Sequence, residues 1–202
     1  DLLADITANL QVLDDQRKSF NDSVSRLDIL ELSDLVSALD VCRVIQNVEL
    51  MNRISENIHW QLVEVGNEGQ ILNMKFKELT RDYGRIEDNI LRDYAVFSLK
   101  KSKQLLENFS FDDLMDLEKI SEVLFEKELD EPLSPSGYRF LSRVELSEKE
   151  ISQIVGHFGQ MSNILEQEEG SFEIVVGEKA PEVKEEIEKA RELILSGKHV
   201  SE

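Results

Sequence analysis

The sequence predicts an all-α fold, in which a helical linker bundle forms around one long helix and a small helical domain follows it. Three observations predict this fold. Apolar residues recur at steps of three and four along most of the chain, which places them on one face of a helix. Only three prolines and nine glycines occur in 202 residues, and both residue types weaken helices. One strong interruption, at residues 129–137, holds two of the three prolines and separates two helical parts.

The first two helices are expected to lie antiparallel to each other. Residues 2–27 have the spacing of an amphipathic helix, and residues 30–33 are expected to form the turn that follows. Residues 35–65 are expected to form the long helix, with Ser33 as the N-cap that satisfies a free amide of its first turn. At 1.5 Å per residue that helix would extend about 46 Å. Its apolar stripe consists of Leu35, Leu39, Cys42, Ile45, Val48, Met51, Ile54, Ile58, Leu62 and Val65.

Two glycines interrupt the stripe of the long helix at its end. Gly66 and Gly69 each weaken a helix by roughly 1 kcal/mol, so a kink or tight turn is expected before the stripe resumes over residues 71–79. Gly84 is expected to end that second segment in the C′ position, where glycine is favoured. Shorter helices are then expected over residues 86–94, 99–109 and 111–117.

The interruption at residues 129–137 is the predicted domain boundary. We assign residues 1–130 to the linker domain and residues 131–202 to the C-terminal domain. Beyond the boundary, Ser147 and Glu150 have the spacing of a capping box, in which two side chains satisfy amides at the start of a helix.

Short helices and a hairpin complete the predicted C-terminal domain. A helix is expected over residues 161–165, and a single helical turn over residues 171–174 leads into a hairpin at residues 175–177. Pro181 suits the first turn of the last helix, residues 183–195, because its missing N–H would be free there anyway. A polar tail follows.

The charge of the chain is unevenly distributed. The net charge is −19, and residues 111–202 hold 23 acidic against 10 basic side chains, whereas residues 51–110 hold 9 of each. Because basic side chains supply most non-specific affinity for DNA, the acidic C-terminal part is expected to bind nucleic acid poorly on its own. The densest basic cluster is Lys100, Lys101 and Lys103, which we interpret as solvent-exposed cover, with phosphate binding as the alternative.

Several classes of protein are excluded at this stage. No apolar run approaches the length that crosses a bilayer, and the first residues lack the basic start and apolar core of a signal peptide. Cys42 is the only cysteine, which rules out an internal disulfide and fits a reducing cytoplasm. Cys42 lies on the apolar stripe, so we predict a buried structural thiol rather than a nucleophile.

No combination of residues predicts catalysis or metal binding. His59, His157 and His199 are far apart in the sequence and form no ligand pair at helical spacing. His59 and Trp60 are expected at the side of the long helix, with the indole partly buried. Paired acids are abundant, as expected of a hydrated surface in so acidic a chain, and no glycine-rich nucleotide loop occurs. We therefore predict no catalytic residue and no metal site.

One resemblance to a known family rests on four runs in the first 130 residues. They are Asp34-Leu-Val-Ser-Ala-Leu-Asp-Val41, Glu49-Leu-Met-Asn-Arg-Ile-Ser-Glu-Asn-Ile58, Glu64-Val-Gly-Asn-Glu-Gly69 and Arg92-Asp-Tyr94. They resemble the helical linker of the DisA family of DNA integrity scanning proteins, whose members make cyclic di-AMP from ATP.

The C-terminal part carries the same resemblance. The run Leu133-Ser-Pro-Ser-Gly-Tyr-Arg-Phe-Leu-Ser-Arg-Val144 is similar to the segment that leads into the family's DNA-binding domain, and Val176-Gly177-Glu178 is similar to its helix-hairpin-helix motif. In that motif glycines let backbone amides approach a DNA phosphate. The resemblance implies that the DNA-binding residues are Val176, Gly177, Lys179, Lys184, Arg139 and Arg143.

This copy of the motif departs from the family pattern at two positions. Val175 stands where the first hairpin glycine belongs, and a β-branched side chain resists positive φ and close approach. Pro181 falls near the position of a small alanine that packs the two helices. With the acidic balance, these changes predict weakened DNA affinity, and a degenerate hairpin that only packs the bundle is the alternative interpretation.

The resemblance also implies what this sequence lacks. The family's cyclase domain carries an Asp-Gly-Ala and an Arg-His-Arg motif for ATP, and neither triplet occurs in this sequence. The chain begins in helical sequence without Met. We therefore expect a portion of such a protein, not an enzyme in itself and without a cofactor, because ATP and a divalent metal would belong to the cyclase domain.

Three hypotheses about function follow. The first is a non-catalytic linker and DNA-sensing portion, located in the cytoplasm, that couples the family's cyclase domain to a DNA-binding end and meets branched or damaged DNA weakly. The second is an acidic helical scaffold whose acidic face binds a basic protein partner, without DNA. The third is an undetected enzyme. A membrane partner is not expected under any of the three.

Overall fold

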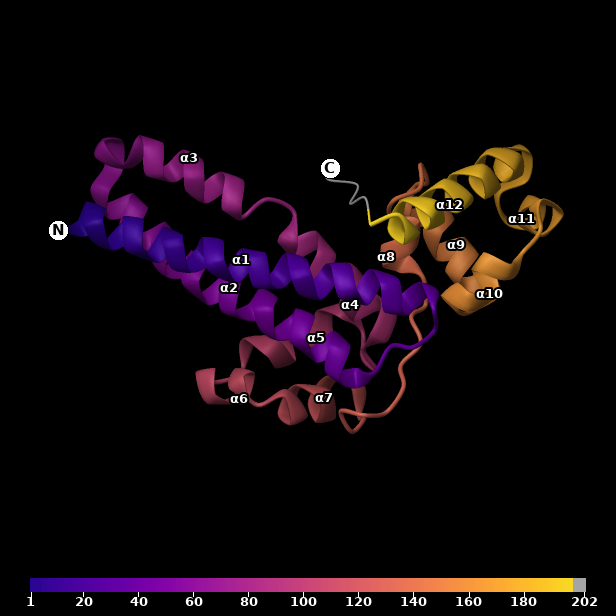
Figure 1. Ribbon diagram of the computed structural model, residues 1–202, viewed down its shortest axis with the longest axis horizontal. Coiled ribbons are helices and arrows are strands. Elements are labelled where there is room, and N and C mark those ends of the chain that lie inside the picture. The colour runs from indigo at the N-terminus through magenta and orange to yellow at the C-terminus, as the bar shows by residue number, and fades with distance from the viewer. Residues whose placement is uncertain (198–202) are drawn as a thin grey trace.

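The computed structural model describes residues 1–197, and over that range every regular element is a helix, so the predicted all-α class is confirmed (Figure 1). Two long helices, α1 (Leu2–Leu32) and α2 (Ala38–Val65), lie antiparallel along the longest axis of the molecule. Among residues 1–197, no helix is both long enough and apolar enough to cross a membrane.

The other helices of the linker part pack along this pair. α3 runs beside α1, whereas α6 and α7 lie on the other side against α2 (Figure 1). The helices are α3 (Gln70–Leu79), α4 (Tyr83–Tyr94), α5 (Leu99–Glu107), α6 (Phe111–Met115) and α7 (Leu117–Phe125), with a 3₁₀ turn, η1 (Gly66–Gly69), before α3.

The C-terminal helices gather at the end of the α1–α2 pair that lies far from the N-terminus (Figure 1). They are α8 (Tyr138–Leu141), α9 (Glu148–Phe158), α10 (Met161–Glu166), α11 (Glu169–Val176) and α12 (Ala180–Leu195), with a 3₁₀ turn, η2 (Gly177–Lys179), before α12.

Each of the two parts has its own hydrophobic core. The linker core is the cluster of buried apolar side chains from residues 6–125, and the C-terminal core is the cluster from residues 140–190. Of the linker helices, only α1 adds an apolar side chain to the C-terminal core, that of half-buried Leu32. The two cores fall on either side of residue 130, although the domain division at that residue stays a prediction.

The start of α2 corrects the expected N-cap. Ser33 caps the C-terminus of α1, and α2 starts after Ser37, whose N–H donates to Asp40 Oδ2 at 2.9 Å in a capping box. The three residues between them are not helical, because Asp34 has a left-handed φ of 53° and the Val36 carbonyl accepts from Leu133 N–H at 2.9 Å. Leu35 is therefore 70% exposed and lies outside the apolar stripe.

Helix α1 also runs further than the expected end at residue 27, to Leu32. Residues 30–32, part of the expected turn, belong to the last turn of the helix, where Glu31 and the nearby Asp28 are buried and bonded to Arg139 of the C-terminal part. Tertiary contacts thus extend the helix beyond what its local pattern indicated.

Two further expectations about the linker part are wrong. Gly84 lies in the first turn of α4 and not in a C′ position, because α3 already ends at Leu79 and Asp82, with a φ of 63°, is the N-cap of α4. Trp60 is 63% exposed, not partly buried.

Most local signals in the sequence are confirmed. The interruption after Val65 is the η1 turn, with Gly66 at a φ of 64°. The capping box of Ser147 and Glu150 starts α9, and Pro181 lies in the first turn of α12, which begins slightly earlier than expected at Ala180. His199 and most of the expected polar tail lie outside the described residues.

The capping box gives a direct test of where α2 begins. Replacing Ser37 with Ala should lower the free energy of unfolding by about 1 kcal/mol, because an N-cap side chain is lost. Ser33→Ala is the matched control and should cost less, since Ser33 Oγ only donates back to the Ile29 carbonyl. Denaturant unfolding followed by circular dichroism would measure both, and a larger loss for Ser33→Ala would contradict the observed start of α2.

Candidate DNA interface and the junction between the two cores

The hairpin between α11 and α12 is built around Gly177. This glycine has a φ of 60° and a ψ of −129°, and its N–H donates to the Glu173 carbonyl to close α11. No atom lies within 4 Å of where a Cβ would be, so the left-handed backbone, not crowding, is what requires glycine. Val175 and Val176 are half-buried against the C-terminal core, so both contribute to packing. The surface of the turn is therefore open at Gly177 itself.

Two lysines flank this hairpin, and both have acidic partners. Lys179 Nζ lies 3.4 Å from Glu150 of the α9 capping box and is largely exposed. Lys184 Nζ donates to the Gln167 carbonyl at 2.8 Å and lies 3.0 Å from Glu188. Lys179 is consequently the more accessible positive charge beside the turn.

The two arginines predicted to bind DNA do not flank the hairpin. They lie at the junction between the two cores, where both contact acidic residues of α1. Arg139 of α8 is 4% exposed; its Nη1 donates to Asp28 and its Nη2 donates to Glu31 Oε2 at 2.7 Å. Arg143 Nη2 lies 2.8 Å from Asp28 Oδ1. Their DNA-binding role stays a prediction, but the guanidinium of Arg139 is enclosed by protein in this conformation.

The junction joins α1, α4 and α8 through polar side chains. Asp93 of α4 accepts three backbone N–H groups at the start of α8, from Gly137 at 3.0 Å, Tyr138 at 2.7 Å and Arg139 at 3.2 Å. The adjacent Tyr94 hydroxyl donates to Glu31 Oε1 at 2.6 Å. We call the set Asp28, Glu31, Asp93, Tyr94, Arg139 and Arg143 the junction network.

One feature of the sequence marks this network, an acidic residue on the apolar stripe of α1. The stripe of α1 that holds Phe20 and Leu27 continues to Glu31, four residues after Leu27, so a carboxylate occupies a position that faces inward. An acid on an apolar stripe requires a buried partner. The pattern could not indicate which of the 23 basic residues that partner is.

The junction network shifts the pKa values of its members. Burial raises the pKa of Asp93 to about 7, and the nearby Glu31 carboxylate adds to this, against the lowering effect of Arg139 and the backbone N–H donors. Burial alone would lower the pKa of Arg139, but Glu31 and Asp28 raise it above its usual value. Two cations already balance Asp28 and Glu31, so a third carboxylate is in excess and holds its proton to higher pH.

A second buried acid lies inside the linker core. Glu87 of α4 is buried, and burial followed by the neighbouring Glu49 carboxylate raises its pKa well above the usual value. Nearby, Lys103 pairs with Asp88 at 2.7 Å, so one of the three clustered lysines already has an acidic partner. Lys101 lies over the Phe97 ring at 4.1 Å, which leaves phosphate binding by this cluster without support.

Cys42 behaves as predicted for a structural thiol. It is fully buried, and burial raises the pKa of its thiol to about 12, although a hydrogen bond with Ser121 opposes the shift. A thiol of this kind carries almost no thiolate at neutral pH and is a poor nucleophile.

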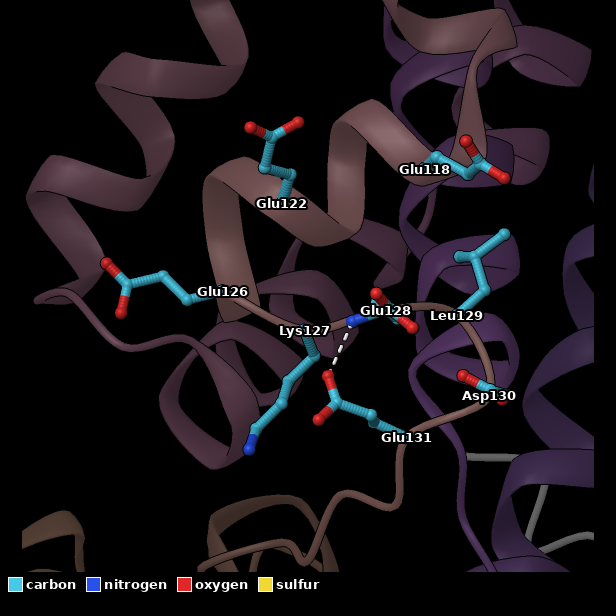
Figure 2. Close-up of a pocket in the computed structure, with 8 residues that line it drawn as sticks. All are labelled: Glu118, Glu122, Glu126, Lys127, Glu128, Leu129, Asp130 and Glu131. Atoms are coloured by element: carbon cyan, nitrogen blue, oxygen red, sulfur yellow. Dashed lines mark hydrogen bonds between the residues drawn. The ribbon is translucent and has the colours of Figure 1, made fainter.

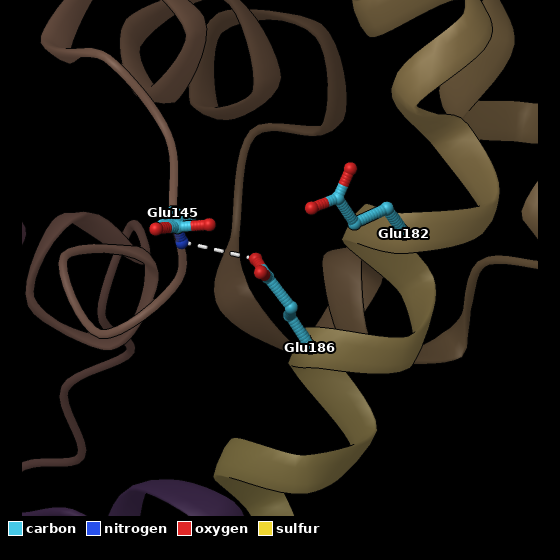
Figure 3. A group of neighbouring side chains, drawn as sticks. All are labelled: Glu145, Glu182 and Glu186. Atoms are coloured by element: carbon cyan, nitrogen blue, oxygen red, sulfur yellow. Dashed lines mark hydrogen bonds between the residues drawn. The ribbon is translucent and has the colours of Figure 1, made fainter.

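Two acidic groupings stand out on the surface. A hollow of about 870 Å³ lies beside α7 and the segment of residues 126–131 that follows it. Its lining residues are Glu118, Glu122, Glu126, Lys127, Glu128, Leu129, Asp130 and Glu131 (Figure 2). Near α12, the carboxylates of Glu145, Glu182 and Glu186 lie within 4.8 Å of one another, but Glu186 is occupied in accepting the Glu145 N–H at 3.0 Å (Figure 3). Exposed acids of this kind are common without an ion, so neither grouping is assigned as a metal site.

Comparison with known proteins identifies the family. The chain belongs to the DisA-linker family, described as the linker region of the DisA bacterial checkpoint controller, whose profile matches residues 1–129. The matched region is the whole α1–α7 bundle and the start of the segment that follows.

The individual relatives carry the name DNA integrity scanning protein DisA. The one from Symbiobacterium thermophilum is 34% identical over 161 residues, which is 77% of this chain and 46% of the relative. The one from Fusobacterium nucleatum is 32% identical over 82% of this chain and 50% of the relative, and one from Clostridium botulinum is 28% identical over 98% and 59%. The chain thus spans about half the length of the curated relatives it matches.

The raised pKa of Asp93 predicts a pH dependence of stability. Because its folded pKa of about 7 exceeds the unfolded value of 3.8, its contribution is complete below pH 4 and is lost as pH rises through 7. The loss is at most about 4 kcal/mol. Asp93→Asn cannot titrate, so the free energy of unfolding should fall less steeply between pH 4 and 8 in that variant, as measured by denaturant unfolding at each pH.

Asp130→Asn provides the control for this pH series. Asp130 is exposed, so its substitution removes the same charge without changing a buried group, and the slope should match that of the unsubstituted chain. Equal slopes for Asp93→Asn and the unsubstituted chain would refute the assignment of Asp93 as the titrating group.

Proposed function

We propose that this chain is the non-catalytic linker and DNA-sensing portion of a DNA integrity scanning protein, acting in the cytoplasm. In this role it couples a cyclase domain that makes cyclic di-AMP to a DNA-binding end. The observation that carries the proposal is the position of the Gly177 hairpin. It lies on the C-terminal helices, at the far end of the α1–α2 pair from the N-terminus (Figure 1).

Rigidity of the long pair supports the coupling role. Gln16 and Asn47 hydrogen-bond between α1 and α2 at 2.7 Å, and apolar residues of both helices form the linker core. A helix pair of this length resists bending, because bending would open its backbone hydrogen bonds and its packed core. It would hold two binding ends at a fixed separation.

Backbone recognition is the mode of DNA binding that the hairpin supports. The open surface at Gly177 would let a phosphate approach the backbone of η2 beyond Gly177, whose own N–H is bonded to the Glu173 carbonyl, and Lys179 would add one positive charge there. Contacts of this kind read the shape of DNA and not its base sequence. With Glu150 beside Lys179 and an acidic surface around the hairpin, we expect weak binding that is strongest at low salt.

Substitution of Lys179 tests the DNA proposal. Binding of a fluorescent four-way DNA junction should weaken in Lys179→Gln, and the slope of log affinity against log salt should decrease in magnitude by about 1, because one phosphate contact is lost. Fluorescence anisotropy across a series of salt concentrations would measure both quantities.

Lys189→Gln is the matched control. Lys189 lies in α12, the helix that starts directly after Lys179; it is largely exposed and paired with Glu185 at 3.0 Å, about 15 Å along the helix from Lys179. Its substitution should leave the salt slope unchanged. Absence of binding by the unsubstituted chain even at the lowest salt would remove the DNA role, and equal effects of the two substitutions would leave only non-specific attraction.

The absence of catalysis is the second part of the proposal. The hollow of Figure 2 is lined by six carboxylates and one lysine, an arrangement that repels a triphosphate. Incubation with ATP and Mg²⁺ or Mn²⁺ should therefore yield no cyclic dinucleotide by chromatography. Formation of cyclic di-AMP by this chain alone would overturn the proposal.

The acidic hollow favours one alternative function, an acidic scaffold for a basic protein partner. Such a partner would be released at moderate salt, because exposed charges more than a Debye length of about 10 Å apart are screened at 0.1 M. A chain that fails to bind DNA at low salt would make this alternative the better interpretation.

A further inference from the structure

We infer that the junction network is a latch that fixes the orientation of the C-terminal helices, and that these helices turn as one body about Ser134 when it opens. Three sets of contacts lead to this inference: the apolar contacts between the two cores, the backbone bonds on each side of Ser134, and the balance of buried charge. The inference deepens the proposed coupling role and rests on it only for its consequence, since the latch itself requires no DNA.

Apolar contact between the two parts is limited. The buried side chains of the linker core come from residues 6–125 and those of the C-terminal core from residues 140–190, so each core closes on itself. From the linker helices, only half-buried Leu32 packs against the C-terminal core. Burial of apolar surface is non-directional and here small, so it defines the relative orientation weakly.

The polar contacts, in contrast, are buried and directional. Arg139 donates to Asp28 and Glu31 on α1 while the amide of the same residue donates to Asp93 on α4. Arg139 therefore ties α8 to two linker helices at once. A guanidinium and carboxylates bond well only in a narrow range of positions, so the network selects one orientation of α8.

Backbone bonds locate the point about which the C-terminal helices would turn. Before Ser134, Leu133 N–H donates to the Val36 carbonyl of the linker part at 2.9 Å. After it, the Pro135 carbonyl accepts from Met161 N–H at 3.0 Å, which joins residue 135 to α10. The bond from Ser136 N–H to the Asp93 carbonyl, at 3.3 Å, connects to α4 and belongs to the junction that opens. Ser134 is exposed and lies between these two anchored stretches, so it is the pivot.

The charge balance makes the latch sensitive to loss of one member. Arg139 has no partner for its Nε, and its two Nη atoms carry the contacts with α1. Removing this cation would leave Asp28 and Glu31 buried with only Arg143 to balance them. A buried charge without its partner is strongly unfavourable, so the C-terminal helices would rotate away and let water reach the two carboxylates.

Distance measurements on the full chain test the latch. Spin labels on cysteines introduced at Lys18 of α1 and Lys189 of α12 would report the orientation, because both positions are exposed whereas Cys42 is buried. Pulsed electron paramagnetic resonance should give one narrow distance distribution for the unsubstituted junction. Arg139→Met should broaden the distribution and displace its mean, while circular dichroism keeps the helix content.

A second readout measures the population of the open form. Cleavage near Ser134 by a nonspecific protease should become about tenfold faster in Arg139→Met, which corresponds to about 1.4 kcal/mol less closing free energy. Arg53→Met is the matched control, since Arg53 donates to the Phe109 carbonyl inside the linker part, and it should change neither readout.

A compensated variant separates opening from unfolding. Arg139→Met combined with Asp28→Asn and Glu31→Gln removes Arg139 and its two carboxylate partners together and should restore a narrow distance distribution. The latch is overturned if Arg139→Met keeps the distances of the unsubstituted chain, or if both variants lose their helix content. Since no DNA is present in these measurements, failure of the latch is distinguishable from failure of DNA binding.

Discussion

The arrangement of the two cores depends on buried ion pairs and hydrogen bonds that join α1, α4 and α8. Arg139 fills the space between Asp28 and Glu31, and Asp93 closes the first turn of α8 with three backbone hydrogen bonds. Without these interactions, Asp28 and Glu31 in the last turn of α1 would have no cationic partner in Arg139. The N–H groups at the start of the four-residue helix α8 would lose Asp93 as their acceptor. The network is therefore a condition for the two cores to meet in one arrangement. An apolar contact of the same area would stabilise their association but would specify their orientation less sharply.

Local signals predicted the helices well because they act over a few residues. The capping box of Ser147 and Glu150, the glycine turn after Val65 and the first-turn Pro181 are all found where the sequence indicated. The error in the start of α2 came from contacts distant in sequence. Ser33 and Ser37 are equally good caps by residue type, and the choice of Ser37 depends on residues 129–133, which pair with residues 36–39 across the bundle.

For the candidate DNA interface, too, local features could be predicted and distant contacts could not. Its turn geometry follows from Gly177 and could be predicted, since a positive φ is a local property. The place of Arg139 could not, because a basic residue in an irregular segment is equally consistent with DNA contact and with a buried ion pair. What decides between these is the pair of inward-facing acids more than a hundred residues earlier. Spacing rules do not connect positions so far apart, and the family resemblance gave a motif without the partners of its residues.

The molecule also contains an internal comparison that bears on how a hairpin becomes a DNA site. Gly66 has a φ of 64° and a ψ of −132°, almost the same as the 60° and −129° of Gly177, and each glycine closes one helix and opens a 3₁₀ turn. Two residues beyond the glycine, however, the η1 turn has Glu68 where the η2 turn has Lys179. The same backbone thus carries opposite charge at equivalent positions. Backbone geometry alone cannot distinguish a packing turn from a phosphate-binding turn, so the charged side chains beside the glycine have to make that distinction. Of these two turns, the one at Gly177 carries a lysine, with Glu178 next to it, whereas the one at Gly66 carries only an acid.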